Sequence, residues 1–224
     1  MTPASGAVRM SLEPTLEREA AAWAEGRLLI GVDEVGRGPL AGPVVAAAVV
    51  FPAGIAPIEG VRDSKTLSSI QRASLVPQLQ AQAVAVGLGA ASAHEIDRLN
   101  IRIATAVAMR RAIARARRRA DVSAQVTRGF QILIDGLPVP ELGYPHQALV
   151  DGDACCYSIA AAGVLAKELR DELMRRLARL HPSYGWETNV GYGTPAHCSA
   201  LNAYGPSAHH RRSFAPVVQL PLFD

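Results

Sequence analysis

The sequence predicts a layered α/β domain, and three observations carry this prediction. The chain has 224 residues, the length of a single domain, and 49% of them are hydrophobic, which is enough to fill a core. Short apolar runs of strand length recur along the chain. Longer segments with helical spacing and capping residues separate these runs, as is typical of layered α/β folds.

Five apolar runs are predicted to be strands. The first run ends in acidic residues, a pattern of buried strands that carry chemistry at their tips. A turn rich in glycine and proline, at 36–43, joins it to the second run. The five predicted strands are 28–33, 44–51, 83–90, 130–135 and 148–151.

Capping residues mark the helices that lie between these strands. One helix is predicted after Ser68. Ser92 and Glu95 have the spacing of a capping box and begin a short helix. Asn100 can cap a longer helix that runs to about residue 120. These helices cover the middle of the chain.

Two further helices are predicted in the last third of the chain. The alanine-rich segment 158–180 is strongly helical and is stopped by His181-Pro182. Thr194-Pro195 begins a last helix that ends at Gly205. Residues 1–26 contain an alanine- and glutamate-rich stretch with weak helical character and are expected to be a variable lead-in.

The composition excludes several classes of protein. The longest strongly apolar run, 44–51, is far shorter than the about 20 residues that cross a bilayer, and residues 1–14 lack a signal-peptide core. The cysteines have no zinc-binding spacing, and Cys155 and Cys156 are adjacent and would form a strained disulfide. We therefore expect a cytoplasmic protein without membrane association, and a monomer.

Positive charge is concentrated in one part of the chain. The net charge is +3, but residues 98–128 hold nine arginines and one acid, Asp121, so this stretch carries +8 and the remainder −5. A basic segment on an acidic body suits a protein that binds a polyanion. An ordinary solvated helix face would give the same pattern, and charge alone leaves both interpretations open.

Four carboxylates stand where apolar segments end or begin. Asp33 and Glu34 follow the first strand, Asp135 ends the strand at 130–135, and Asp153 precedes the long helix. Acids at strand ends of an α/β sheet can converge on one spot. Carboxylates held that close repel unless a cation lies between them, and oxygen ligands suit Mg²⁺ or Mn²⁺. Each acid alone is an ordinary turn residue, and only their joint placement indicates a metal site.

Sequence blocks around these acids resemble bacterial ribonuclease HII. The similarity extends in family order from about residue 28 to 217, and its first block is long and specific. The matching blocks are GVDEVGRGPLAGP at 31–43, DSK at 63–65, ILIDG at 132–136, GD at 152–153, SIAAA at 158–162, YGW at 184–186, GYGT at 191–194 and RRSF at 211–214.

The resemblance implies a fold, an activity and a cofactor. The fold would be ribonuclease H-like, a mixed central sheet flanked by helices with a C-terminal helical extension. The activity would be cleavage of the RNA strand of RNA–DNA hybrids and incision of duplex DNA 5′ of embedded ribonucleotides, leaving 5′-phosphate and 3′-hydroxyl ends. Asp33, Glu34, Asp135 and Asp153 would bind two Mn²⁺ or Mg²⁺ ions that act on the phosphodiester.

The same resemblance implies substrate-binding residues. The Gly36-Arg37-Gly38 turn would read the ribose 2′-hydroxyl through main-chain groups, and Tyr192 would pack on the following sugar. Four further residues are candidate contacts to phosphate, namely Lys65, Lys167, Arg211 and Arg212. Surface or packing roles for the two lysines are equally open. His197 lies near Tyr192, and a histidine on a helix surface is the simpler interpretation.

The C-terminal tail is similar to the short peptide with which bacterial replication proteins bind the sliding clamp. Its glutamine and apolar anchors are Gln219, Leu220, Leu222 and Phe223. Alternatively, the tail packs on its own domain. We expect four segments in total: the lead-in 1–26, a catalytic core 27–180, a helical substrate-binding extension 181–217 and the tail 218–224.

Three other functions compete with a hybrid-cleaving ribonuclease. A resolvase-like nuclease acting on DNA alone would have no use for the Gly36-Arg37-Gly38 turn or Tyr192. A binding module for hybrids without catalysis would not need all four acids. An enzyme acting on a small phosphate compound is the remotest, because no phosphate-loop or dinucleotide fingerprint is present.

Overall fold

The computed structural model describes residues 13–122 and 129–219. The helices are α1 Glu17–Ala24, α2 Ser69–Gln82, α3 Ala93–Val122, α4 Tyr157–Leu180, α5 Trp186–Asn189 and α6 Pro195–Tyr204. The strands are β1 Leu28–Val35, β2 Val44–Val50, β3 Ala85–Ala91, β4 Phe130–Asp135 and β5 Gln147–Leu149. Short 3₁₀ helices occur at η1 Ser64–Thr66, η2 Pro140–Leu142, η3 Gly152–Ala154, η4 Pro182–Tyr184 and η5 Val217–Gln219.

The strands form one mixed sheet in the order β3-β2-β1-β4-β5. β1 pairs antiparallel with β2 across the turn 36–43, and β2 pairs antiparallel with β3 after a longer connection that contains α2. β4 lies parallel to β1, and β5 lies parallel to β4. The carboxyl ends of β1 and β4 therefore meet at one edge of the sheet. This mixed sheet flanked by helices confirms the predicted fold class.

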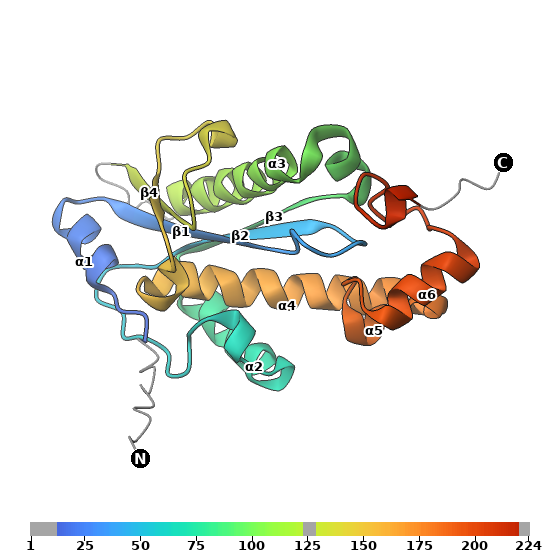
Figure 1. Ribbon diagram of the computed structural model, residues 1–224. Coiled ribbons are helices and arrows are strands. Elements are labelled where there is room, and N and C mark those ends of the chain that lie inside the picture. The colour runs from blue at the N-terminus through green and yellow to red at the C-terminus, as the bar shows by residue number, and fades with distance from the viewer. Residues whose placement is uncertain (1–12, 123–128, 220–224) are drawn as a thin grey trace, which may run out of the picture.

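Helices cover both faces of the sheet (Figure 1). α3 packs on one face, where its alanines and Met109 meet the apolar side chains of β1, β2 and β4. α4 packs on the other face, and α2 lies against α4. α4 approaches β1 closely, because a Cβ on Gly31 would overlap the backbone of Ser158. The start of α4 is thereby fixed against the centre of the sheet.

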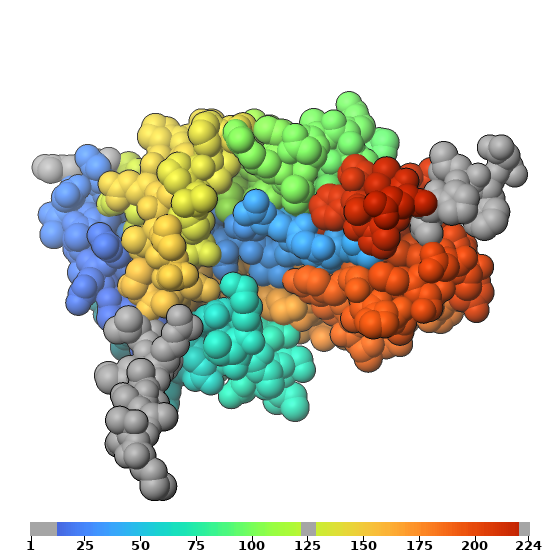
Figure 2. All heavy atoms as spheres, in the orientation of Figure 1, coloured from blue at the N-terminus to red at the C-terminus, as the bar shows by residue number. Residues whose placement is uncertain are grey.

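The chain after α4 folds into a small helical layer beside the turn that follows β1. Tyr184, Trp186 and Leu201 form an apolar cluster there with Leu40 from the turn and Met174 from α4. Figure 2 shows this C-terminal layer in orange and red against the blue surface of the first two strands, with the green α3 above. The packing joins the C-terminal segment to the same sheet edge that carries the acids.

Most predicted helix ends are confirmed. Ser68 and Gln71 form the capping box that begins α2. α3 contains the break expected at Asn100, whose φ of 65° lies outside the helical region and whose Oδ1 accepts from the Ile103 amide. Thr194 caps α6, which ends before Gly205.

The last strand differs from its prediction. β5 spans Gln147–Leu149 rather than 148–151, since Asp151 takes a left-handed conformation before η3 and cannot continue a strand. In the described ranges, no helix combines the length and apolar character needed to cross a membrane.

Candidate active site

The four predicted acids lie at one edge of the sheet. Asp33 and Glu34 are near the carboxyl end of β1, and Asp135 is the last residue of β4. The parallel register pairs Val32 with Ile134, so the next residues, Asp33 and Asp135, are neighbours across the two strands. Asp153 lies in η3, directly before α4. Sheet register and the start of one helix together position all four carboxylates.

Main-chain hydrogen bonds fix these carboxylates. The amide of Glu34 donates to Asp33 Oδ1 at 2.6 Å. The amide of Gly152 donates to Asp135 Oδ1 at 2.8 Å, which ties the end of β4 to the turn that carries Asp153. Asp33 is also packed against α4, since a Cβ on Gly163 would lie only 2.5 Å from Asp33 Oδ2.

Burial and neighbouring negative charge raise the pKa of three of these acids. Asp33 is 7% exposed, and burial, followed by the charges of Glu34 and Asp135, raises its pKa well above the ordinary value. Burial raises the pKa of Glu34 as well, although the guanidinium of Arg37, 3.3 Å away, opposes the shift. Burial and the charge of Asp135 raise the pKa of Asp153 to about 6. A cation among these groups would relieve this unfavourable concentration of negative charge.

The donor set fits a hard divalent cation. All four candidate ligands are carboxylates, which suit Mg²⁺ and Mn²⁺ rather than zinc or copper. Within the described ranges, no three acidic, histidine or cysteine side chains are grouped closely enough to hold one ion together in the conformations they adopt. Binding an ion between several acids therefore requires their side chains to turn toward it, and their mutual electrostatic influence indicates that they are within reach.

A hollow of about 560 Å³ adjoins the acids. Glu34, Arg37 and Asp135 line its inner side, and the loop 136–141 with Arg102 lines its outer side. Arg102 forms an ion pair with Glu141 that links α3 to this loop. Glu34 and Asp135 are therefore accessible from this hollow, whereas Asp33 is buried behind them.

The predicted recognition turn follows Asp33 and Glu34 directly. Two buried arginines bind the main chain of this turn. Arg211 donates to the carbonyl oxygens of Gly36 and Arg37, and Arg170 donates to the carbonyl oxygen of Pro43. The prediction that Arg211 contacts phosphate is wrong, because its side chain is 0% exposed and its donors are directed at main-chain oxygens. Arg211 belongs to the charged run RRSF at 211–214, and such a run is typical of an exposed surface.

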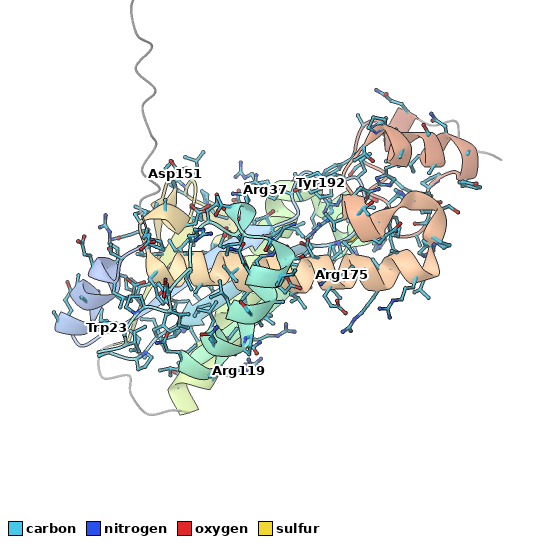
Figure 3. The ribbon with its side chains drawn as sticks, turned by 90° about the horizontal axis from the view of Figure 1, so that it is seen from below. Trp23, Arg37, Arg119, Asp151, Arg175 and Tyr192 are labelled. Atoms are coloured by element: carbon cyan, nitrogen blue, oxygen red, sulfur yellow. The ribbon has the colours of Figure 1, made fainter. Side chains whose placement is uncertain are left out.

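Tyr192 stands beside this turn and is 46% exposed. A Cβ on Gly38 would lie 3.8 Å from the Tyr192 ring, so ring and turn are neighbours. In Figure 3, Asp151, Arg37 and Tyr192 lie along one side of the molecule, and Arg119 lies on the opposite side. The exposed tyrosine, the turn and the segment next to Asp153 therefore share one face.

The remaining predicted contacts fall into two groups. Lys65 is 79% exposed, and its Nζ lies 4.0 Å from Asp153 Oδ2, so it is beside the acids and open to solvent. Burial lowers the pKa of Lys65, but the nearby carboxylates outweigh this effect and raise it. Lys167 instead forms an ion pair with Asp171 at 2.8 Å and is largely buried. Arg212 is exposed.

The clamp-binding candidates lie at the end of the described chain. Gln219 is exposed and is the last residue of η5. The other three, Leu220, Leu222 and Phe223, lie outside the described residues.

His197 is buried, so its predicted place on a helix surface is wrong. Its Nδ1 lies 2.8 Å from the Tyr192 carbonyl, and Trp186 Nε1 donates to its Nε2 at 3.1 Å. His210 is buried with it, with the two Nε2 atoms 3.0 Å apart. The short helix α6 alone did not reveal this burial, because it depends on packing against Trp186 and His210 from other segments.

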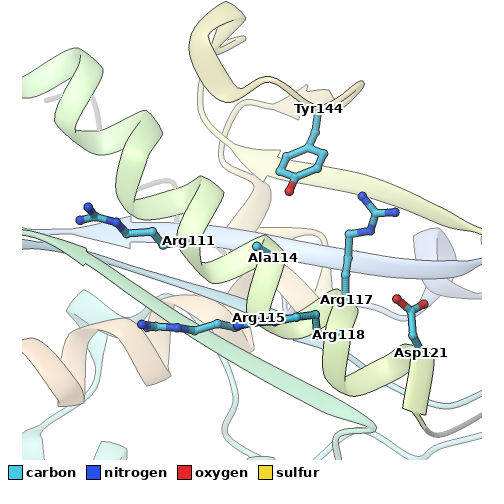
Figure 4. Close-up of a pocket in the computed structure, with 7 residues that line it drawn as sticks. All are labelled: Arg111, Ala114, Arg115, Arg117, Arg118, Asp121 and Tyr144. Atoms are coloured by element: carbon cyan, nitrogen blue, oxygen red, sulfur yellow. The ribbon is translucent and has the colours of Figure 1, made fainter.

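The arginine-rich half of α3 does not form part of this site. Figure 4 shows the hollow that Arg111, Arg115, Arg117 and Arg118 line with Tyr144. Arg111 and Arg115 donate to carbonyls of β3, and Arg117 lies over the rings of Phe130 and Tyr144 at 5.5 Å. Most of these cations are therefore already engaged within the fold.

Sequence reasoning missed Arg170, which lies on α4 among alanines and leucines. Its side chain is 0% exposed and bonds three main-chain carbonyls. An arginine on the apolar face of a predicted core helix was the available signal, because a buried cation must find partners.

Comparisons with known proteins agree with this geometry. The family model described as ribonuclease HII matches residues 30–217. A ribonuclease HII of Synechococcus sp. (strain JA-3-3Ab) is 51% identical over 218 residues, which cover 96% of this chain and 94% of that protein. The fold is similar to that of ribonuclease H2 from Pyrococcus horikoshii OT3, with a TM-score of 0.69 and 24% identity over 86% of this chain and 96% of that one. The fold is also similar to that of a chain in the solved PCNA:RNase HII complex from Archaeoglobus fulgidus. The TM-score is 0.63, with 21% identity, and the match covers 82% of this chain and 91% of that chain.

Proposed function

Because this chain belongs to the ribonuclease HII family and is a ribonuclease H that acts on RNA–DNA hybrids, we propose that it also incises duplex DNA 5′ of an embedded ribonucleotide. The products would be a 5′-phosphate and a 3′-hydroxyl. The observation that carries the proposal is the contiguity of the acids with the Gly36-Arg37-Gly38 turn, since Glu34 is separated from Gly36 by a single residue. Phosphodiester cleavage and recognition of the sugar would then act on the same nucleotide.

We propose that the four carboxylates hold two divalent ions, Mg²⁺ or Mn²⁺. Asp33, Glu34, Asp135 and Asp153 supply oxygen donors only, and burial together with neighbouring negative charge raises the pKa of Asp33, Glu34 and Asp153. When bound, such ions lower the pKa of an attacking water and stabilise charge on the leaving 3′-oxygen. The carboxylates would position the scissile phosphate only through such ions, and Lys65, exposed beside Asp153, could approach the same phosphate.

Recognition of the ribose would come from the turn and the tyrosine. Backbone groups of the turn can reach the 2′-hydroxyl because glycines at Gly36 and Gly38 leave no side chain in the way. The exposed ring of Tyr192, next to Gly38, would pack on the sugar that follows the ribonucleotide. Arg212 is the exposed member of the Arg211-Arg212 pair and remains a candidate phosphate contact.

We further propose that four segments of the chain have different roles. Residues 27–180 would form the catalytic core and 181–217 the substrate-binding extension, with 1–26 as a lead-in. The tail 218–224 would bind the replication sliding clamp, which its glutamine and spaced apolar residues support and which fits the solved complex of a protein of similar fold with PCNA. We also propose a cytoplasmic monomer, and the three free cysteines suit the reducing compartment that this location provides.

The proposal is tested by cleavage of a labelled DNA duplex that contains one ribonucleotide. We expect incision on the 5′ side of the ribonucleotide with Mn²⁺ or Mg²⁺, and none with EDTA. Asp33→Asn should lower the rate by about 100-fold or more, a typical loss when one group that stabilises transition-state charge is removed. A long RNA–DNA hybrid serves as the positive substrate and an all-DNA duplex as the negative one.

Two results would contradict the proposal. Cleavage of the all-DNA duplex at a similar rate would identify a nuclease without ribose recognition. Binding of the ribonucleotide duplex without cleavage in either metal would identify a binding module without catalysis.

A further inference from the structure

Arg170 and Arg211 are two fully buried cations without acidic partners. Both side chains are 0% exposed. Among the ion pairs within residues 13–122 and 129–219, none involves either residue. Burial, followed by the charge of Arg170, lowers the pKa of Arg211 to about 9, so it is still protonated at neutral pH. Asp171 acts electrostatically on Arg170 and Asp97 on Arg211, but neither acid forms an ion pair with them. Burying a charge without a directly paired acid is costly, so other groups must compensate these cations.

Their hydrogen bonds converge on the turn between β1 and β2. Arg211 donates to the carbonyl oxygens of Gly36 at 2.5 Å and Arg37 at 2.8 Å, and its Nε donates to that of Gly42 at 3.0 Å. Arg170 donates to other carbonyls of the same segment, those of Ala41 at 3.2 Å and Pro43 at 3.0 Å. The carbonyl groups of this turn are therefore directed at the buried guanidinium groups.

This arrangement determines where the amide groups of the turn point. In a trans peptide the carbonyl and the next N–H point in opposite directions. With the carbonyls of Gly36 and Arg37 turned inward, the N–H groups of Arg37 and Gly38 face outward. In the part of the chain that the structure describes, neither amide has a hydrogen-bond partner. Two unpaired donors thus face the side that carries Tyr192.

Arg170 also joins this turn to the loop that carries Tyr192. Its Nη1 donates to the Val190 carbonyl at 3.0 Å. The amide of Leu40 donates directly to the Gly191 carbonyl at 2.8 Å, and a Cβ on Gly191 would lie 2.5 Å from the Ala41 oxygen. The turn and the tyrosine loop are therefore held as one unit with little freedom to separate.

We propose that Arg170 and Arg211 are positioning residues for ribose recognition, which orient the amides of Arg37 and Gly38 toward the substrate and hold Tyr192 at a fixed place beside them. The inference rests on the proposed function, because it assigns to these residues the discrimination between ribose and deoxyribose. A guanidinium is suited to this task, since its planar fork bonds several carbonyls at once and lysine cannot reproduce the geometry.

The test is the affinity ratio between two duplexes of identical sequence, one with a single ribonucleotide and one all-DNA. It is measured by fluorescence anisotropy with Ca²⁺ replacing Mg²⁺ to suppress cleavage. We expect Arg211→Lys and Arg170→Lys to lower this ratio by about tenfold, as the loss of one or two well-oriented hydrogen bonds would. Binding of the all-DNA duplex should change little.

The matched control is Arg72→Lys. Arg72 is buried and also bonds main-chain carbonyls, those of Ser64 and Leu67, and unlike Arg170 and Arg211 it pairs with acids, Asp171 and Glu168. It contacts neither the turn nor the tyrosine loop. This variant should lose thermal stability and keep the affinity ratio. A ratio that falls equally in all three variants would assign the effect to general loss of stability and overturn the proposal.

Hydrogen exchange of the unmodified protein gives a second test that does not depend on whether the variants fold. The amides of Arg37 and Gly38 should exchange rapidly in the free protein and become protected by the ribonucleotide duplex but not by the all-DNA duplex. Slow exchange in the free protein, or equal protection by both duplexes, would overturn the inference. A wild-type affinity ratio near one would overturn the proposed function itself, whereas a wild-type preference that Arg170→Lys and Arg211→Lys retain would overturn only the positioning role.

Discussion

Among single residues, the buried carboxylate of Glu19 joins α1 to the start of α4. Glu19 is 1% exposed, and its Oε1 accepts from the Ser158 amide at 2.7 Å and from Cys156 Sγ at 3.3 Å. Cys156 occupies the N-cap position of α4 and makes no side-chain cap bond of its own. A residue from another helix thus performs the capping role, and a negative charge at a helix N-terminus is stabilising.

Loss of this cap should destabilise the protein. We expect Glu19→Ala to lower the free energy of unfolding by about 1 to 2 kcal/mol, the usual cost of removing an N-cap acceptor. Glu17→Ala is the matched control, because Glu17 is an exposed acid in the same helix. Urea denaturation measures both. If the two variants unfold at the same urea concentration, Glu19 does not cap α4.

Single residues also show which parts of the site a sequence can reveal. Asp33, Asp135 and Asp153 could be predicted because each ends or precedes an apolar segment, and parallel strands bring such ends together. Arg211 and His197 could not, because the local pattern of a charged run or a short helix does not say which face another segment will cover. Their burial is decided by packing between residues far apart in the sequence.

Among the elements, the contact between α3 and β3 explains much of the arginine-rich stretch. β3 is an edge strand, and such strands expose carbonyl groups that invite pairing with other chains. Arg111, Arg115 and Arg119 donate to the carbonyls of the alternate β3 residues Ala90, Leu88 and Val86. Helical spacing of four on α3 matches the strand spacing of two, so one row of arginines covers the edge. The sequence showed this row as a charged helix face and could not show its partner.

Removal of this row should expose the edge of the sheet. We expect the triple variant Arg111→Gln, Arg115→Gln, Arg119→Gln to lose about 0.5–1.5 kcal/mol of stability per hydrogen bond and to aggregate on mild heating. Chemical denaturation and light scattering measure these two effects. The triple variant Arg98→Gln, Arg110→Gln, Arg118→Gln, at three exposed arginines of the same helix, is the control for loss of charge alone. Equal aggregation of both variants would mean that charge, rather than edge protection, keeps the protein soluble.

Across the whole molecule, a buried histidine pair joins the C-terminal layer to the site. The hydrogen bonds define the tautomers: His197 Nδ1–H donates to the Tyr192 carbonyl, and its Nε2 accepts from Trp186. His210 Nε2–H therefore donates to His197, and its Nδ1 accepts from the Ser207 amide at 2.9 Å. Both rings must be neutral, because an added proton on either would face an existing donor.

Burial makes this pair a source of acid sensitivity. Burial, followed by the positive charges that His197, His181 and His209 would carry, lowers the pKa of His210 to about 3. The unfolded chain takes up this proton near pH 6.5, whereas the folded protein does so only near pH 3. Between these values the unfolded state binds more protons, so stability is fully present above about pH 6.5 and falls as the pH decreases.

Replacement of His210 by a residue that cannot titrate should therefore reduce the acid sensitivity of the whole fold. His210→Gln keeps one donor and one acceptor, and we expect its free energy of unfolding to fall less steeply between pH 6 and pH 4, by about one proton per molecule. His94→Gln, at an exposed histidine, should retain the wild-type slope. Urea denaturation across this pH range gives the slopes. Parallel curves for wild type and His210→Gln would mean that His210 takes up its proton in the folded protein as readily as in the unfolded chain. Asp33, Glu34 and Asp153 could not then be the source of the acid sensitivity, because their raised pKa values make the folded state bind protons more tightly and favour folding as the pH falls.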